Sequence, residues 1–314
     1  MTQDRPLIGI ALMLGFCVMA PFGDALAKII GQSASLAALL IVRFGVQVVA
    51  LYPVAAAKGE LRKRLAPRVL WLIALRTMMH IAGIAAMFAA LRYLPLADAV
   101  AIVFVMPFFM LLLGKWLYDE EVGPARILAS VAGFFGVLLV IKPSFAEVGL
   151  PALLPVLVAV LFSGFMLTTR RLSKDVEPLA LQVVSGVMAL PLMVPFIVAG
   201  QMIGLHDAQI YWPGAETAGL ILAVGIMGTF AHLLMSWALK YAPGATLAPM
   251  QYLEIPFAVG IGFVLFGDLP DALALVGITI TMAAGLFIIH REQTKEKARK
   301  AARPELGPMP TPAE

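Results

Sequence analysis

The hexamer ALRYLP at Ala90–Pro95 is repeated almost unchanged as ALKYAP at Ala238–Pro243. Each copy follows an apolar run long enough to cross a membrane and precedes another such run. Its final proline suits the first turn of a helix, where the missing N–H would have no partner. Each hexamer therefore predicts the end of one helix and the start of the next. The repeat predicts that the chain consists of two related halves.

The composition is that of a membrane protein. Of the 314 residues, 61% are hydrophobic and 13% are charged, whereas soluble domains have about 25% charged residues. The single cysteine, Cys17, excludes an internal disulfide. The basic residues behind the net charge of +4 are spread over short links and a C-terminal tail, so we expect no nucleic-acid partner. The apolar N-terminal run continues through Pro21, which favours a membrane helix over a signal peptide.

Ten apolar stretches approach the length of about 20 residues that a helix needs to cross the hydrocarbon core. They predict an all-α integral membrane protein with ten transmembrane helices. The predicted spans are 7–30, 34–56, 69–91, 96–117, 124–141, 151–169, 178–199, 217–239, 243–266 and 271–290.

These spans divide the chain into three parts. We expect 1–148 to form a first five-helix repeat, 149–290 a second repeat, and 291–314 a basic, proline-rich cytoplasmic tail that is disordered.

Lysine and arginine are divided unevenly between the two sides, and this bias sets the orientation of a membrane protein. One side holds the tail and most basic link residues, which are Lys58, Arg62, Lys63, Arg64, Arg68, Arg170, Arg171, Lys174 and Lys240. The other side holds Arg92 and Lys142 together with most of the acidic link residues. We therefore predict a multi-pass protein of a bacterial inner membrane with both termini in the cytoplasm.

In this topology the two hexamers fall on opposite sides of the membrane, because an odd number of spans separates them. A second pair of similar stretches, VMPFFMLLLGKWLYDEE at 105–121 and EIPFAVGIGFVLFGDLP at 254–270, agrees with the duplication. Related units in opposite orientations form an inverted-topology repeat, in which a binding site lies between the halves near the membrane midplane. This arrangement predicts a secondary transporter that works by alternating access.

Several stretches are similar to those of one known superfamily. DALAKII at 24–30, ALRYLPLADAVAIVFVMPFF at 90–109 and GKWLYDEEVGPARILASVAGFFGVLLVIKP at 114–143 carry the similarity. Over about residues 7–291 the chain resembles the drug/metabolite transporter superfamily, specifically its EamA-type branch of ten-helix transporters. LADAVAIVFVMP at 96–107 is most similar to carriers of riboflavin and S-adenosylmethionine.

The resemblance implies a small organic metabolite as substrate: a vitamin such as riboflavin, a cofactor like S-adenosylmethionine, or an amino acid. An exporter of amino acids or toxic metabolites is the alternative within the same class. A membrane enzyme acting on lipid-linked substrates is the alternative of another class.

Ionisable side chains inside membrane spans are costly, so we expect them to face a partner or a wet cavity. Arg76 and His80 lie one turn apart on the third span, and the planar fork of Arg76 suits an anionic group of a substrate. The alternative for Arg76 is a bridge to a carboxylate on another helix. Arg43 has no second ionisable residue on its span, and we interpret it as a brace for neighbouring carbonyl groups.

Glu254 lies in the ninth span beside Gln251 and Tyr252, in a segment flanked by prolines. Prolines interrupt helical bonding, and broken helices at membrane depth line cavities. We interpret this cluster as substrate-binding and Glu254 also as a proton carrier, or else as the partner of a basic residue. His232 on the eighth span is either a further substrate contact or an interhelical hydrogen-bonding residue.

Asp24 and Lys28 share one face of the first span. They form either an intrahelical pair or, with Glu254, part of a gate or coupling site. Phe104 and Tyr252 each follow their hexamer by nine residues, so we expect them to cover a flat substrate from opposite sides.

The chain has no Walker A, HExxH or GxSxG sequence. We therefore expect no cofactor, metal or catalytic site, and the partners are a small-molecule substrate, the lipid bilayer and a coupled proton. Small residues at close spacing on the fifth and tenth spans predict tight packing within the bundle or the contact of a homodimer.

Overall fold

The computed structural model describes residues 6–31, 33–62, 64–106, 108–109, 112–113, 124–173, 175–210, 213–241 and 251–301. Helices dominate these residues, so the prediction of an all-α protein is confirmed. In chain order they are α1 (Pro6–Ile30), α2 (Leu36–Ala57), α3 (Pro67–Leu91), α4 (Leu96–Val103), α6 (Pro124–Val148), η1 (Leu150–Leu153), α7 (Leu154–Leu172), α8 (Pro178–Met202), η2 (His206–Ala208), α9 (Ala215–Tyr241), α11 (Glu254–Phe266) and α12 (Ala272–Ala301).

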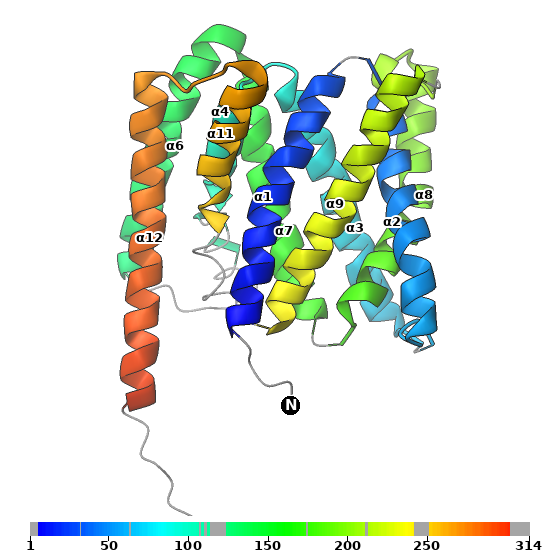
Figure 1. Ribbon diagram of the computed structural model, residues 1–314, viewed down its shortest axis with the longest axis horizontal. Coiled ribbons are helices and arrows are strands. Elements are labelled where there is room, and N and C mark those ends of the chain that lie inside the picture. Colours follow the sequence, from blue (N-terminus) through cyan, green and yellow to red (C-terminus); the bar gives the residue numbers. More distant parts are fainter. Residues whose placement is uncertain are drawn as a thin grey trace, which may run out of the picture.

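Within the described ranges, seven helices are long and apolar enough to cross a membrane: α1, α2, α3, α6, α7, α8 and α9. The apolar helices Glu254–Phe266 and Ala272–Ala284 are shorter. Large apolar side chains on the outer surface, such as Trp71 and Val49, suit contact with lipid. The protein is therefore a multi-pass membrane protein. The start of α1 and the end of α12 lie at the same end of the bundle (Figure 1).

The fourth and ninth predicted spans are both interrupted. The break in the ninth span agrees with the prolines around Glu254, and the break in the fourth corrects the expectation of a continuous helix. α4 ends at Val103 and the chain turns at Phe104, whereas α11 begins at Glu254 after a turn at Tyr252. In each case a proline follows within four residues, and proline has no N–H to bond the carbonyl of the preceding helical turn. Residues 107, 110–111, 114–117 and 243–250 of these two spans lie outside the described residues.

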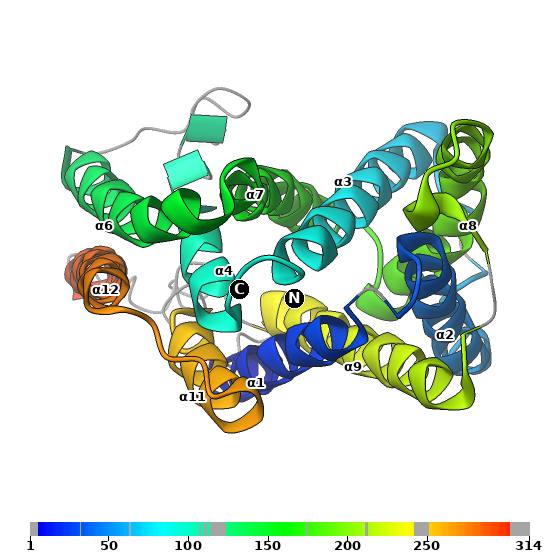
Figure 2. The same cartoon turned by 90° about the horizontal axis from the view of Figure 1, so that it is seen from above.

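The helices pack in pairs that correspond between the two halves of the chain. α1 lies along α9 and α7 lies along α3, while α2 packs on α8, α4 on α11 and α6 on α12. In this pattern each helix of the first half has a counterpart in the second: α1 corresponds to α7, α2 to α8, α3 to α9, α4 to α11 and α6 to α12. Exchanging every helix for its counterpart gives the same set of pairs. Seen from above, α6 and α12 lie at one side of the bundle, and α2 and α8 lie at the other (Figure 2).

The small residues of the fifth and tenth spans bring α6 and α12 into backbone contact. A Cβ atom on Gly136 would lie 2.8 Å from the carbonyl oxygen of Gly277. The hydroxyl of Thr281 lies 3.4 Å from the carbonyl oxygen of Gly133 and donates to that of Gly277 at 2.9 Å. This small-residue face therefore packs within the chain, as the first of its two interpretations predicts.

α12 continues past the last predicted span to Ala301. The predicted tail therefore begins as helix at 291–301, and 302–314 lie outside the described residues.

Candidate functional site

A cavity lies between α1, α2, α3, α4, α7, α9 and α11, and its empty space, including the part open to solvent, is about 1080 Å³. Its walls are mainly apolar and include the aromatic rings of Phe16, Phe88, Phe104 and Phe162. A largely apolar chamber with a few polar groups is the usual form of a small-molecule site. The cavity also lies between helices from both halves of the chain, where an inverted repeat would place a substrate.

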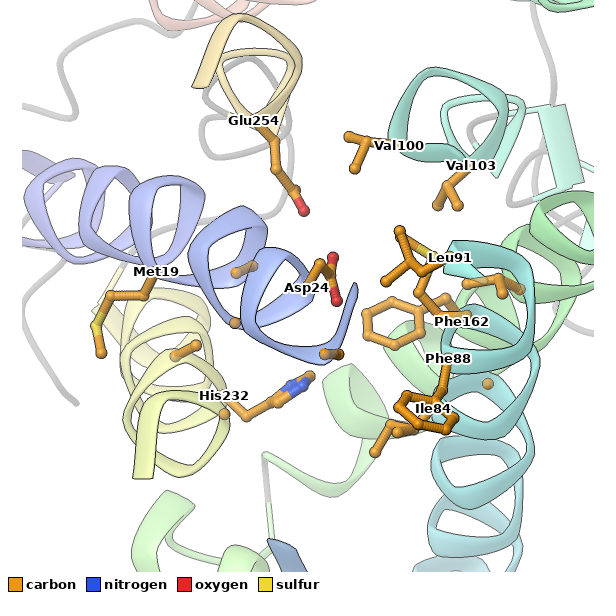
Figure 3. A pocket seen from close by; sticks show the side chains of 18 of the residues that line it. Met19, Asp24, Ile84, Phe88, Leu91, Val100, Val103, Phe162, His232 and Glu254 are labelled. Carbon is orange, nitrogen blue, oxygen red and sulfur yellow. The ribbon is translucent and has the colours of Figure 1, made fainter. Parts of the chain in front are cut away.

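Five polar side chains of the described residues line this cavity: Asp24, Arg43, His232, Gln251 and Glu254. Asp24, His232 and Glu254 point into it from α1, α9 and α11 (Figure 3). The carboxyl group of Asp24 interacts electrostatically with both Arg43 and Glu254. The polar groups therefore form one charged region in an otherwise apolar chamber.

Four predicted substrate-binding residues thus line the cavity: Phe104, His232, Gln251 and Glu254. Three others, Arg76, His80 and Tyr252, are not among its lining residues.

Arg43 is the cavity residue to which sequence reasoning gave a different role. Its guanidinium lies against Gly228 of α9, where any Cβ atom would overlap it. Arg43 is 5% exposed, and its Nε has no hydrogen-bond partner within the described part of the chain. A guanidinium with an unused donor beside an open space is a candidate contact for an anionic group. The interpretation of Arg43 as a brace did not include this position in the cavity wall.

Arg76 instead braces three helices. Its Nε donates to the hydroxyl of Thr169 on α7 at 2.7 Å, and its Nη1 donates to the hydroxyl of Ser185 on α8 at 2.8 Å. The guanidinium carbon lies 4.3 Å from the ring centroid of Phe165. Arg76 is completely buried and faces away from the cavity lining, which corrects its predicted contact with an anionic substrate.

His80 lies behind His232 rather than in the cavity wall. The two Nε2 atoms are 3.2 Å apart, so one ring donates to the other. The His80 ring packs against Phe44 and Phe165, with centroid distances of 5.5 and 4.7 Å. Arg76 and His80 share a face of α3 as the spacing predicts, but α3 is rotated so that this face meets neighbouring helices.

Phe104 and Tyr252 lie against each other. Their ring centroids are 5.2 Å apart and the rings are inclined by 35°, which is the geometry of direct aromatic contact. No flat molecule fits between the two rings in this structure, contrary to the prediction. The contact instead joins the break after α4 to the break before α11.

Lys28 turns away from Asp24. Its Nζ donates to Asp268 Oδ2 and to the carbonyl oxygen of Leu94, both at 3.0 Å. Lys28 thus joins the end of α1 to the first hexamer and to the link between α11 and α12. The predicted intrahelical pair is replaced by this contact, and Asp24 faces the cavity.

The basic residue of each hexamer forms an ion pair. Arg92 donates to both carboxylate oxygens of Asp207 at 2.8 Å and to the carbonyl oxygen of Gly31 at 3.1 Å. Lys240, at the same position in the second hexamer, pairs with Glu177 at the start of α8. The ends of α3 and α9 that carry these residues lie at opposite ends of the bundle (Figure 1).

Asp207, which lies outside the membrane spans, gives the fold a pH dependence. The hydrogen bonds from Arg92 hold the pKa of this carboxyl below its usual value of 3.8. Because this pKa is lower in the folded protein than in the unfolded chain, the ionised carboxylate stabilises the fold at pH values above 3.8. This stabilisation is lost as the pH falls through the folded-state pKa. We expect Asp207→Asn to reduce stability at pH 7 by about 0.2–1 kcal/mol. Thermal melting at pH 7 and in steps below pH 3.8 checks this, because the difference from wild type should shrink as the pH falls.

Comparison with known proteins agrees with this geometry. The model of the EamA-like transporter family matches residues 7–142 and again 150–290. A riboflavin transporter of Rhizobium johnstonii is 30% identical over 227 residues, which cover 72% of each chain. An S-adenosylmethionine uptake transporter of Rickettsia prowazekii is 24% identical over 91% of this chain and 94% of its own length.

One solved crystal structure has a similar fold. It shares a TM-score of 0.60 and 15% identity, over 96% of this chain and all of that one.

Proposed function

Because this chain belongs to the EamA-like transporter family, we propose that it carries a small organic metabolite across the membrane through the central cavity by alternating access. The observation that carries this proposal is the cavity itself, which is apolar, lies between helices of both halves and gathers its charged groups in one region. The names of the relatives favour a vitamin such as riboflavin or a cofactor such as S-adenosylmethionine. They also favour transport over the alternative of a membrane enzyme.

An inverted repeat of ten membrane-crossing helices underlies this mechanism. Three observations support it: the two hexamers, the two successive matches of the family model, and helix packing that is unchanged when the halves are exchanged. The positions of the basic links support an inner-membrane protein with cytoplasmic termini. Exchanging the conformations of the two halves would open the cavity first to one side and then to the other.

Each polar group of the cavity has its own role in this proposal. Arg43 donates to a carboxylate of the substrate or, for an uncharged substrate such as riboflavin, to a carbonyl oxygen, because its guanidinium keeps an unused donor beside the cavity. Gln251 hydrogen-bonds to a neutral polar group, and Phe88 and Phe162 contact its apolar part. Glu254, with Asp24 as its charged neighbour, exchanges a proton with whichever side the cavity faces.

Replacing Glu254 with glutamine tests the proton role. We expect the variant to lose the response of transport to a pH gradient and at least tenfold of its driven rate, because glutamine has the shape of glutamate but binds no proton. The measurement is transport of labelled riboflavin, S-adenosylmethionine, aromatic amino acids and a nucleotide sugar by proteoliposomes, with and without the gradient.

Glu216→Gln, at an exposed position at the start of α9, is the matched control and should respond like wild type. Loading the label inside or outside the vesicles separates uptake from export. Folded protein that moves none of these compounds in either direction would contradict the proposed substrate classes. A pH response that survives in Glu254→Gln would contradict only the proton role.

A further inference from the structure

A hydrogen bond between two histidines connects the halves of the protein next to the cavity. His80 belongs to α3 and His232 to α9, helices that correspond to each other in the packing of the two halves. Their Nε2 atoms are 3.2 Å apart and their ring centroids 4.4 Å apart. His232 lines the cavity, whereas His80 is completely buried behind it. A proton that enters the cavity therefore meets His232 first and His80 only through it.

The number of protons on this pair decides whether the bond exists. A neutral imidazole has one N–H donor and one acceptor nitrogen, whereas a protonated imidazole has two donors. One proton between the two Nε2 atoms makes the observed bond. The Nδ1 atoms of both rings are buried and have no partner among the described residues. Neither ring is thus held in one tautomer by a second bond, and either can change its protonation state without breaking another contact.

The surroundings make the pair sensitive to charge. Phe16, Phe44, Phe162 and Phe165 enclose the rings. The charged groups that interact electrostatically with both histidines are Arg43 from α2 and Arg76 from α3. The acids Asp24 from α1 and Glu254 from α11 face the same cavity as His232 (Figure 3). Both arginines are positive and oppose a proton on either ring, whereas the acids in the cavity favour one.

We propose that His80 and His232 form a proton-operated latch between the two halves. When both rings are protonated, each Nε2 carries a hydrogen, so the hydrogen bond is lost and two like charges face each other at 3.2 Å. α3 then separates from α9 on the cavity side, and loss of a proton restores the bond. The inference rests on the proposed function only in that the separation opens the transport cavity.

Distance measurement between the two helices tests the latch without any substrate. Spin labels are placed at the lipid-facing positions Leu75 on α3 and Phe230 on α9, in a Cys17→Ser background. Pulsed electron paramagnetic resonance then records the distance distribution of the full chain in nanodiscs from pH 8 to pH 5. We expect a second, longer distance to appear at low pH, with a population ratio that changes by up to about tenfold per pH unit for each proton bound.

Matched variants separate the latch from other proton sites. His80→Gln with His232→Gln keeps hydrogen-bonding groups but binds no proton, and should show one distance at every pH. Arg43→Gln removes a positive charge near the rings and should move the midpoint of the change to higher pH. Glu254→Gln removes an acid from the cavity and should retain the second distance with its midpoint at lower pH.

Three results would overturn the latch: no pH-dependent distance in the wild type, the same change in the double glutamine variant, or its loss in Glu254→Gln. If the double variant does not fold, His80→Gln alone decides, since it also removes the second proton. Transport that persists while the distances stay constant would overturn the latch and leave the proposed function standing.

Discussion

Arg76→Ala should destabilise the folded protein and not merely slow transport. The variant loses two hydrogen bonds from a charged donor, to Thr169 and Ser185, and the contact with the ring of Phe165. Hydrogen bonds to charged groups contribute about 1.5–3 kcal/mol each, and the deleted side chain leaves a void. We expect a loss of about 3–5 kcal/mol, which lowers the melting temperature by on the order of 10 °C. Thermal melting in detergent measures this directly.

Arg43→Met is the control variant for Arg76→Ala. Arg43 is also a buried arginine of the bundle, but it lines the cavity and its Nε is unpaired within the described residues. Methionine preserves most of the volume, so this variant should melt within about 3 °C of wild type and yet lose transport. If Arg76→Ala melts like wild type and loses only transport, Arg76 contacts the substrate as the sequence predicted.

Gly228→Ala should abolish most transport through a single added methyl group. That methyl would occupy the space of the Arg43 guanidinium, so the arginine must move away from its place beside Asp24. Misplacement of a binding group by about 1 Å costs on the order of 100-fold in comparable sites, and we expect at least a tenfold loss of rate. Alanine is favoured over glycine in a helix by about 1 kcal/mol, so the folded state should survive. Initial transport rates and melting temperature are measured together.

Gly219→Ala provides the matched control on the same helix. No atom of the described residues lies within 4 Å of the Cβ position at Gly219, so this variant should transport like wild type. Normal transport by Gly228→Ala would mean that the position of Arg43 is unimportant.

The fold could be predicted largely from the sequence because its signals are local. Long apolar stretches indicate the helices, the two hexamers mark where α3 and α9 end, and the cysteine count and the missing motifs limit the chemistry. The prolines around Glu254 indicated the break at Tyr252, but the break at Phe104 was not predicted, although Pro107 follows it. A proline in a membrane helix produces a bend, a break or no visible change, depending on neighbours that the sequence does not identify.

The site was predicted only in part, because it depends on the rotation of each helix about its axis. Glu254 and His232 could be identified as embedded ionisable residues, and both line the cavity. Arg76 was expected to contact substrate and Arg43 to brace the bundle, whereas Arg43 lines the cavity and Arg76 bonds to Thr169 and Ser185. What distinguishes them is Gly228 beside one and Ser185 beside the other, and both neighbours lie on helices far away in the chain. One sequence without structure holds no information on which of these residues meet.

The ion pairs at the two ends of the bundle are unequal, and this has a kinetic consequence. Opposite the termini, Arg92–Asp207 and Lys28–Asp268 each join a residue of the first half to one of the second. At the end that carries the termini, Lys240–Glu177 joins two residues of the same half. Among the described residues, opening the end opposite the termini must break these two ion pairs between the halves. Opening the end that carries the termini breaks none of the three pairs. Under alternating access, the activation barrier of a transport cycle then lies on the step that exposes the cavity to the side opposite the termini. Salt, which screens exposed ion pairs, should accelerate that step more than the return.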